Sequence, residues 1–513
     1  MARDLYLAID VGTGGIRSAL VDRQGRILAF SHQEHEQIVP HYGWSEQRPA
    51  DWWDGVTATL RAVVGEVEGA ADRITAICAC GQMHGSVLID AEGRLTRDTA
   101  LLWNDKRTAP QVDAFTDAHA LERYLTVTAN LATPAWPAFK LRWIAENDPQ
   151  AYDKAATVLM PKDYIGYRLT GERAWDTTEA SMSFLMDASS GDWSKSLLEM
   201  TGLRRDLLPE IKATHAVLGP LSEAAARETG LTAGVPVLVG GGDYPVALLG
   251  SGVAEPGMAS DVTGTSTIVS VLHRAPVIDP QVSNVATVEG HWASFALLDA
   301  GGDAVRWARR AFHENALSYD AVTAAAERAD CGASSLFFLP YLSGERFGAA
   351  ANARAQFFGL TAGHGLPDLH RAVLEGVAFA VRRKLDMLQG GGKRPERFVA
   401  AGGGAKSALW VAIKASMLGT PYLVPEELEC GIVGAACMMA VASGDAPDLK
   451  TAVARMVRFE KEVVPDPAWS ERYDRMAPVF DQIFDASVGL YGCLDALDGD
   501  IEQLVEDRQS RDC

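Results

Sequence analysis

A chain of 513 residues is too long for one ordinary hydrophobic core, so its length predicts two or more domains. Hydrophobic residues make up 48% of the chain and its mean hydropathy is −0.01, which is typical of a globular protein with a sizeable core. The formal net charge of −20 argues against a nucleic-acid or anionic-membrane partner, because an acidic surface is repelled by both. Such a protein binds an anion only through local hydrogen-bond donors or a metal ion.

The first half of the chain predicts a meander of strands followed by helices and further strands. The apolar run "LYLAI" (residues 5–9) is typical of a central strand, and "IRSALVD" and "RILAFSH" follow it as antiparallel partners. A helix that starts near Pro49 comes next, and then "ITAICACG", a buried strand. Residues 110–230 read as helical and irregular, and "VPVLVGGGD" reads as a buried strand that ends in a glycine turn.

After residue 255 the pattern starts again. "MASDVTGTSTIVSVLH" predicts strand, turn and strand. Four further stretches predict a strand and helix, a long helix, a strand with a glycine turn and helix, and a small-residue helix: "HWASFALLDAGGDAVRWARRAF", "DLHRAVLEGVAFAVRRKLDMLQ", "RFVAAGGGAKSALWVAIKASML" and "GIVGAACMMAVASG". We predict domains of residues 1–252 and 253–485, and an acidic tail of residues 486–513 that is a frayed helix or disordered.

The seven cysteines show no spacing typical of a metal site. Cys78 and Cys80 lie in "ITAICACG" and would both point to one buried face of the strand; redox or metal chemistry is the alternative. The N-terminal stretch has no signal-peptide core, and no run approaches about 18 uninterrupted apolar residues. We therefore expect a reduced, cytoplasmic protein.

One pattern is written twice, as "LYLAIDVGTGGIRSALVD" near the start and as "GMASDVTGTSTIVSVLH" in the second half. Each copy is an apolar run, an Asp, a Gly/Thr-rich turn and a second apolar run. Glycine lets the backbone approach a ligand closely, and successive N–H groups with Thr or Ser hydroxyls can bind an anion. Two such turns could hold two ends of a polyphosphate; ordinary hairpin turns are the alternative.

Together, "DVGTGGIR", "DVTGTS" and "AAGGGAKS" resemble the two phosphate segments and the adenosine segment of the sugar kinase–Hsp70–actin superfamily. Within it, six stretches resemble the FGGY carbohydrate kinases in the same order: "GWSEQRPADWW", "GQMHG", "LWNDKRT", "GGGD", "PYLSGER" and "FGLTAGHGLPDLHRAVLEGVAF". The resemblance runs from about residue 5 to about residue 480. It implies two actin-like (ribonuclease H-like) α/β domains with an active-site cleft between them.

The resemblance implies an enzyme that uses ATP and Mg²⁺ to phosphorylate a ketose. D-xylulose, converted to D-xylulose 5-phosphate, comes first, because "GQMHG", "WND" and "PYLSGER" resemble the family members that act on it. Ribulose, erythritol or another sugar or polyol is the first alternative. An ATP-gated binding protein of the Hsp70 or actin type is the second, disfavoured because "GQMHG" and "GGGD" would have no use there. A homodimer stays open.

For the phosphates, the resemblance implies that Asp10 holds Mg²⁺, a hard cation that prefers oxygen ligands; a turn-capping Asp is the alternative. It implies that the two turns bind the nucleotide's phosphates through Thr13, Gly14, Gly15, Arg17, Gly264, Thr265 and Ser266. A structural cation is the alternative for Arg17. The adenosine side would be bound by Gly403, Gly404, Ala405, Ser407 and Gly434. Helix packing is the alternative for Gly431 and Gly434, and is favoured for Gly301, Gly302 and Asp303.

Asp243 is the candidate catalytic base. It follows a glycine turn at the start of a predicted helix, whose N-terminus would stabilise a carboxylate, so we expect it to be ionised at neutral pH. A plain N-cap Asp is the alternative. The resemblance places the sugar against Met83, His84, Trp103, Arg107, Asp243 and Tyr244; core packing is the alternative for Trp103, and Asp105 is read as structural.

The sequence departs from the family's pattern in three places. Tyr244 stands where members that act on xylulose usually have Asn, Phe347 and Gly348 follow "GER" in place of Thr-Pro, and Thr267 follows "GTS" in place of Gly. The first departure bears on the identity of the sugar, because the usual Asn contacts it.

Overall fold

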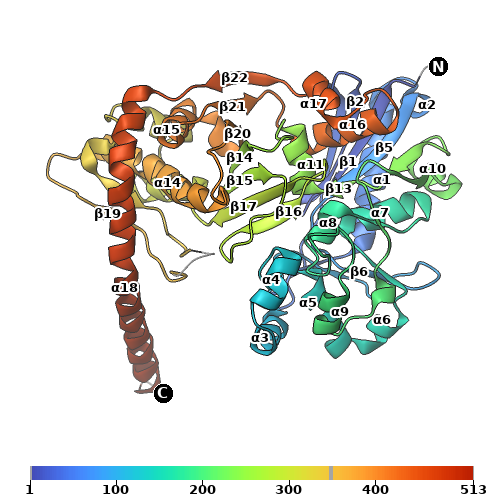
Figure 1. Cartoon of the computed structure of the whole chain (residues 1–513), viewed down its shortest axis with the longest axis horizontal. Coiled ribbons are helices and arrows are strands. Elements are labelled where there is room, and N and C mark those ends of the chain that lie inside the picture. Colours follow the sequence, from blue (N-terminus) through green and yellow to red (C-terminus); the bar gives the residue numbers. More distant parts are fainter. Residues whose placement is uncertain (1–2, 346–349, 512–513) are drawn as a thin grey trace. The chain divides into compact units, whose positions relative to one another are not determined.

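The structure, a computed structural model, describes residues 3–345 and 350–511, those from 498 onward by their backbone alone. The chain forms two compact units. Unit 1 consists of Met1–Pro256, Leu272–Ser294 and Glu426–Arg458, and unit 2 of Gly257–Val271, Phe295–Pro425 and Phe459–Cys513. Unit 1 contains a seven-stranded mixed sheet. Most strands of a second seven-stranded mixed sheet lie in unit 2, and its edge strand Ser283–Ala286 falls in the unit 1 segment Leu272–Ser294. Helices pack on both sheets, so the predicted α/β class is confirmed (Figure 1). Arg346, Phe347 and Gly348 lie outside the described residues.

The sheet of unit 1 begins with the predicted antiparallel meander. It has the order β11-β12-β5-β1-β2-β3, with β13 paired to β5. Its strands are β1 (Leu5–Val11), β2 (Gly15–Asp22), β3 (Ile27–Glu34), β5 (Ile74–Gly81), β11 (Val217–Pro220), β12 (Pro236–Leu238) and β13 (Gly241–Gly242). β5 runs parallel to β1, and β12 and β13 run parallel to β5. The carboxyl ends of β1, β5 and β13 therefore meet at one edge.

Helices cover both faces of this sheet. On one face, Tyr6, Ala8, Cys78 and Cys80 pack against α16 (Cys430–Ala442), so both cysteines are buried as predicted, and both are free thiols. On the other, α1 (Pro49–Glu66) packs so closely that a Cβ at Gly55 would lie 2.8 Å from Ile16. The other helices of unit 1 are α2 (Ala70–Arg73), α3 (Ala109–Ala118), α4 (Glu122–Thr128), α5 (Pro137–Asn147), α6 (Pro149–Lys154), α7 (Pro161–Thr170), α8 (Thr177–Ser181), α9 (Lys195–Thr201), α10 (Glu223–Thr229), α11 (Asp243–Gly250) and α17 (Leu449–Met456).

The second sheet repeats the arrangement around the second turn. Its order is β16-β17-β15-β14-β20-β21-β22. These strands are β14 (Met258–Thr263), β15 (Thr267–His273), β16 (Ser283–Ala286), β17 (Trp292–Leu298), β20 (Arg397–Ala401), β21 (Tyr422–Pro425) and β22 (Phe459–Val463). β14 pairs antiparallel with β15 and parallel with β20, just as β1 pairs with β2 and β5. The repeated sequence pattern thus folds into a repeated structure.

The helices of unit 2 include α12 (Gly302–His313), α13 (Tyr319–Ala326), α14 (Leu366–Leu388), α15 (Ala408–Leu418) and α18 (Pro467–Arg511). Short strand pairs are β4 (Glu46–Gln47) with β7 (Ala100–Leu101), β6 (Val87–Ile89) with β8 (Thr157–Leu159), β9 (Trp175–Asp176) with β10 (Ile211–Lys212), and β18 (Phe337–Leu339) with β19 (Gln356–Phe358).

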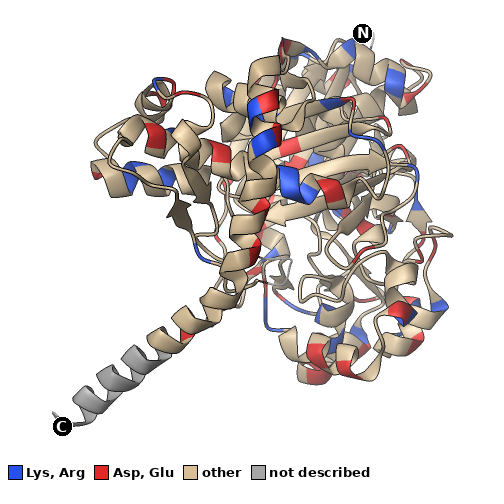
Figure 2. Ribbon diagram, turned by 60° about the vertical axis from the view of Figure 1, so that its left-hand side comes forward, with Lys and Arg blue, Asp and Glu red and all other residues tan. Residues whose placement is uncertain are grey.

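The acidic end of the chain, for which a frayed helix or a disordered tail is predicted, is part of α18, which runs from Pro467 to Arg511. Met476, Phe480 and Ile483 are buried at helical spacing, and Leu490 and Leu494 continue the same spacing as exposed residues. An apolar period of this kind sustains a helix even among many acidic residues. Basic and acidic residues are interspersed in the view of Figure 2. Among the described helices, none has the length and apolar character needed to cross a membrane.

Candidate active site

Asp10 lies at the edge of the unit 1 sheet where the parallel strands end. In the register of the sheet it stands beside Arg17 on β2 and beside Cys80 on β5, and Cys80 stands beside Gly241 on β13. The Oδ2 atom of Asp10 accepts a hydrogen bond of 3.1 Å from Arg17, whereas Oδ1 is buried and has no hydrogen-bond partner among the described residues. Burial raises the pKa of Asp10, and Arg17 opposes that rise. The orphaned oxygen gives Asp10 a free ligand position.

The first turn is held by a network of amides. The Thr13 hydroxyl donates to Gln82 Oε1 (3.1 Å), and Gln47 Nε2 donates to the Thr13 carbonyl (2.7 Å). Gln82 also donates to Gln47 (2.8 Å). A Cβ on Gly14 would meet nothing within 4 Å, so the backbone there is open to a ligand. A Cβ on Gly15 would lie 2.5 Å from the Gln33 carbonyl, so packing against β3 requires that glycine.

Asp243 is the first residue of α11, and Gly242 is the N-cap, so the plain N-cap interpretation of Asp243 is wrong. Its Oδ1 accepts a hydrogen bond of 2.7 Å from the Tyr244 backbone N–H. Desolvation, together with the nearby charge of Asp10, raises the pKa of Asp243 to about 7. The expectation that Asp243 is fully ionised at neutral pH considers only the helix N-terminus, which favours the carboxylate. Loss of hydration and the neighbouring Asp10 carboxylate disfavour the ionised form more strongly.

His84 is fixed in an unusual conformation directly after β5. Its φ of 68° lies in the left-handed region, its ring Nδ1 is 3.2 Å from the Met182 carbonyl, and its ring packs edge-on against Trp136. Desolvation, with a smaller effect of the Lys140 charge, lowers the pKa of His84 to about 3, so the ring is neutral. Met83 is buried so close to Gly242 that a Cβ there would lie 2.7 Å from the Met83 sulfur. His84 and the turn before Asp243 thus lie in the same region of unit 1.

Lys140, on α5, holds the His84 backbone in place. Its Nζ donates to the His84 carbonyl (2.7 Å), and its side chain is fully buried. Desolvation lowers the pKa of Lys140 to about 7, with Asp105 and Glu179 raising it and Arg107 lowering it.

We predict that Lys140→Met raises KM for the sugar about tenfold, because His84 loses the bond that stabilises its strained backbone. The pKa of Lys140 is about 7 in the folded chain and 10.5 in the unfolded chain. Between these values the unfolded chain binds the extra proton, so wild-type stability gains a contribution as pH rises from 7 to 10.5. The Met variant lacks that contribution. Urea unfolding of both proteins at pH 7 and pH 10 measures it, and an equal pH dependence would contradict the assignment.

Arg107 contacts other side chains of the protein on several sides. Its guanidinium forms ion pairs with Asp105 (2.6 Å) and Glu46 (2.6 Å) and lies 3.6 Å above the ring of Trp44. Asp105 is fully buried and also accepts the Ser45 N–H (2.7 Å), which agrees with its interpretation as a structural residue. Contact of Arg107 with a sugar stays a prediction.

Trp103 is 43% exposed, so core packing does not account for it. Its Nε1 donates to the Thr13 hydroxyl (3.0 Å), which brings the indole to the first turn. Tyr244 is half-buried beside Asp243 at the start of α11. Contact of Trp103 and Tyr244 with a sugar stays a prediction.

In unit 2, two glycine-containing segments, one around Gly301 and one around Gly402, contact the second turn. The Gly264 N–H donates to the Ser266 carbonyl (2.9 Å), and the turn accepts the Gly302 N–H at Gly264 (2.7 Å) and the Asp303 N–H at Thr265 (3.0 Å). Every close approach requires glycine: a Cβ on Gly301, Gly302 or Gly402 would lie 2.6–2.7 Å from backbone of this region. Gly403, by contrast, has open space where a Cβ would be, and a Cβ on Gly264 would make only an ordinary contact, 3.9 Å from the Ser266 carbonyl oxygen.

Two predicted adenosine-side residues have clear structural partners. The Ser407 hydroxyl caps α15 by accepting the Trp410 N–H (3.2 Å). A Cβ on Gly434 would lie 2.0 Å from the Val246 carbonyl, so this glycine lets α16 pack against α11 within unit 1. Ala405 is buried, and Gly404 packs against Thr263. Nucleotide contacts of these residues stay predictions.

The second Asp of the repeated pattern, Asp261, is neutralised. Lys414 binds both of its oxygens (2.9 and 2.8 Å), and the Tyr422 hydroxyl donates to it (3.0 Å). All three residues are buried. Asp261 lies one residue further from its turn than Asp10 does: Asp10 directly precedes the last strand pair (Val11 with Ile16), and Asp261 stands two residues before it (Thr263 with Thr267). Of these two residues, Asp10 alone keeps an oxygen without a partner.

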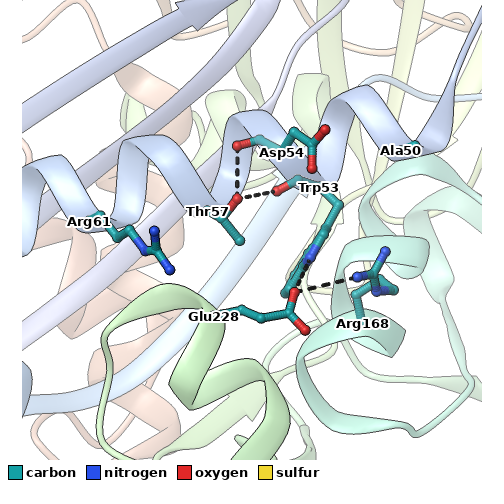
Figure 3. Close-up of a pocket in the computed structure, with 7 residues that line it drawn as sticks. All are labelled: Ala50, Trp53, Asp54, Thr57, Arg61, Arg168 and Glu228. Carbon is teal, nitrogen blue, oxygen red and sulfur yellow. Dashed lines mark hydrogen bonds and ion pairs between the residues drawn. The ribbon is translucent and has the colours of Figure 1, made fainter.

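A hollow of about 340 Å³ lies elsewhere, between α1, α7 and α10 (Figure 3). Its central polar groups satisfy one another: Trp53 Nε1 donates to Glu228 (2.7 Å), and Arg168 stacks 4.3 Å above the Trp53 ring. It contains none of the predicted site residues, and we assign it no ligand.

Sequence reasoning missed the residues that hold the site in place. Gln82 lies within "GQMHG" and could have been found there, since a buried amide in such a motif needs partners. Gln47 lies within "GWSEQRPADWW" and could have been found in the same way. Lys140, Lys162 and Thr178 carry no local signal, because each acts on a segment far away in the sequence.

Comparison with known proteins agrees with this architecture. Residues 5–250 match the N-terminal domain of the FGGY family of carbohydrate kinases, and residues 259–443 match its C-terminal domain. The xylulose kinase of Escherichia coli K12 is 33% identical over 419 residues, which cover 81% of this chain and 85% of that protein. The autoinducer-2 kinase of E. coli O139:H28 is 30% identical over 512 residues, 94% of each protein. The crystal structure of xylulose kinase from Rhodospirillum rubrum has a TM-score of 0.89 at 30% identity and covers 95% of this chain and 100% of that one.

A repeated α/β unit with a strand-end Asp and glycine-rich turns agrees with a two-domain sugar kinase, and the matches to carbohydrate kinase domains show that class. The chain belongs to the FGGY family of carbohydrate kinases. The expected family, fold class and enzyme class are confirmed, and an Hsp70- or actin-type binding protein is set aside, because both halves match carbohydrate kinase domains.

Proposed function

We propose that this carbohydrate kinase transfers the γ-phosphoryl group of ATP to D-xylulose and yields D-xylulose 5-phosphate. The observation that carries the proposal is the cluster in unit 1 of a base with a pKa of about 7, a strand-end Asp and a constrained His84. The relatives named xylulose kinase support the choice of sugar. The relative named autoinducer-2 kinase makes another polyhydroxylated substrate the alternative.

Asp243 would accept the proton of the sugar hydroxyl as that oxygen attacks phosphorus. A base is most effective when its pKa is near the working pH, and the pKa of about 7 meets that condition. The hydrogen bond from the Tyr244 N–H fixes the carboxyl group, so that its second oxygen is the one free to take the proton. Arg17 and the turn N–H groups would stabilise negative charge on the phosphates.

The residues present fit Mg²⁺ and ATP. Asp10 has a buried carboxylate oxygen without a partner, and Mg²⁺ in kinases takes one or two carboxylates with phosphates and waters as its other ligands. When bound, the metal and nucleotide supply charge neutralisation and the phosphoryl group. Thr13 and Gly14 of unit 1 would bind phosphate oxygens, and the open space where a Cβ on Gly14 would be supports this. Gly264, Thr265 and Ser266 of unit 2 would bind phosphate oxygens as well.

The activity is tested by sugar-dependent ADP release. Purified protein with ATP and Mg²⁺ is assayed against D-xylulose, ribulose, hexuloses, erythritol and gluconate. We expect D-xylulose to have the highest kcat/KM of the compounds assayed. A higher kcat/KM for another sugar would keep the kinase and replace the substrate.

Tyr244 is the residue that we expect to modify this preference. An Asn, the usual residue here, offers an amide to a sugar hydroxyl, and a site built on such a bond discriminates by about 10⁴-fold, against about 10–200-fold for an apolar wall. We predict that Tyr244→Asn raises kcat/KM for D-xylulose relative to the other sugars. The assay is the sugar panel with both proteins. An unchanged rank order with a lower melting temperature would mean that Tyr244 only packs.

A further inference from the structure

A buried polar cluster lies directly behind the turn that carries Asp243. It consists of Lys162 and Asp163 at the start of α7, Asp176 before α8, and Thr178 within α8. Lys162, Asp176 and Thr178 have no exposed surface. Burying such groups costs free energy unless each is paired, so their arrangement calls for an explanation.

Thr178 joins this cluster to the turn before the base. Its hydroxyl accepts the Gly242 backbone N–H (2.9 Å) and donates its one proton to Asp176 Oδ1. Asp176 also accepts the Thr178 backbone N–H (2.7 Å), which fixes the threonine. Because the carboxylate takes the hydroxyl proton, a lone pair of the Thr178 oxygen is left for Gly242.

The same cluster holds the other end of the turn. Lys162 Nζ contacts Asp176 Oδ2 (2.7 Å) and pairs with Asp163, and it donates to the Val239 carbonyl (3.2 Å). Val239 and Gly242 are the two ends of the segment that leads to Asp243. The buried polar cluster therefore contacts this segment at both ends, at the Val239 carbonyl and at the Gly242 N–H.

The turn needs such an anchor because of its glycines. Gly240 has φ of +80°, and a Cβ there would lie 1.9 Å from the Ala79 carbonyl. Gly242 must admit Met83, since a Cβ would lie 2.7 Å from it. Close approach thus demands glycine, and glycine leaves the backbone free to move. The strand before Asp243, β13, consists of Gly241 and Gly242.

We propose that Thr178, fixed by Asp176, is a positioning residue for the catalytic base. It acts on Asp243 through the Gly242 N–H and does not touch the substrate. A displacement of about 1 Å at a reacting group can cost about 10²-fold in rate. The inference rests on the proposed function in so far as Asp243 is the base of a sugar kinase.

The test compares Thr178→Val with Thr178→Ser and with Thr229→Val. Valine keeps the shape of threonine and removes the acceptor for Gly242, and serine keeps the acceptor. Thr229 is an equally buried threonine in unit 1 whose hydroxyl bonds to the Ala225 carbonyl (2.7 Å) within α10. Each variant is assayed on the sugar that the wild type turns over fastest, so the identity of the sugar does not affect the comparison.

We expect Thr178→Val to lower kcat by about 10- to 100-fold with KM for ATP within about threefold, as misplacement of the base requires. Thr178→Ser should recover kcat to within about threefold, and Thr229→Val should lose stability without losing kcat. A Thr178→Val enzyme with wild-type kcat, or a serine variant as slow as the valine variant, would overturn the inference. If the valine variant does not fold, Thr178→Cys, a weaker acceptor, should give an intermediate kcat, and a wild-type value would overturn it. A wild type without sugar-dependent ADP release would instead contradict the proposed function.

Discussion

Replacement of Asp243 by Asn is expected to lower kcat by roughly 10²–10⁴ while nucleotide binding persists, because a general base usually contributes that much. Asn keeps the shape of the side chain and its acceptor for the Tyr244 N–H. It cannot take the proton of the sugar hydroxyl. Steady-state kinetics and calorimetric ADP binding measure the two effects separately, and near-normal kcat would remove Asp243 from the mechanism.

The same substitution should alter stability in a pH-dependent way. The pKa of Asp243 is about 7 in the folded chain and 3.8 in the unfolded chain, so ionisation opposes folding increasingly as pH rises between these values. The melting temperature of Asp243→Asn relative to wild type should therefore rise from pH 4 to pH 7. Asp187→Asn is the matched control: Asp187 accepts the Ser189 N–H (2.8 Å) in a loop of unit 1 outside the site, and kcat should not change.

Replacement of Asp10 by Asn is expected to lower kcat by about 10²-fold or more and to raise the Mg²⁺ concentration needed for half-maximal rate. The amide oxygen of Asn can still accept the hydrogen bond from Arg17. The side chain lacks the negative charge that a hard cation such as Mg²⁺ requires. ADP binding without metal should change less than turnover. Titration of the rate with Mg²⁺ measures this, and a wild-type Mg²⁺ requirement would refute a metal role for Asp10.

The repeated fold supplies the control for this experiment. Asp261 is the Asp of the second copy of the sequence pattern; it stands one residue further from its turn than Asp10 does, and it pairs with Lys414. Asp261→Asn leaves a buried lysine charge without its partner, which typically costs about 3–5 kcal/mol. It should therefore lower the melting temperature strongly and leave the Mg²⁺ requirement unchanged. If both variants behaved alike, the distinction between the two positions would be wrong.

Much of the fold follows from local pattern. Strand, turn and strand around Asp10 and Asp261 are predictable because apolar runs flank Gly/Thr turns, and the position of Asp243 follows from a strand, a glycine turn and an apolar helix. These signals lie within short windows. They place the candidate residues at strand ends and a helix start, which is where the structure has them.

What local pattern misses is decided by contacts between distant segments. α16 is apolar on all sides, so its sequence does not indicate which sheet it covers, and it packs in unit 1 although it follows the second repeat. The ionisation of Asp243 depends on Asp10, which is far away in the sequence. Lys140 and Lys162 are fully buried, and charged residues in a helix normally indicate a solvent-exposed face.

The most direct test of the account is to follow one reaction to its product. Wild-type protein is incubated with ATP, Mg²⁺ and D-xylulose, and ADP is quantified while phosphorus NMR locates the new phosphate ester. We expect one D-xylulose 5-phosphate for each ADP, with no comparable ADP release when sugar is omitted. ADP release at the same rate with and without sugar, or no phosphate on any sugar of the panel, would contradict it.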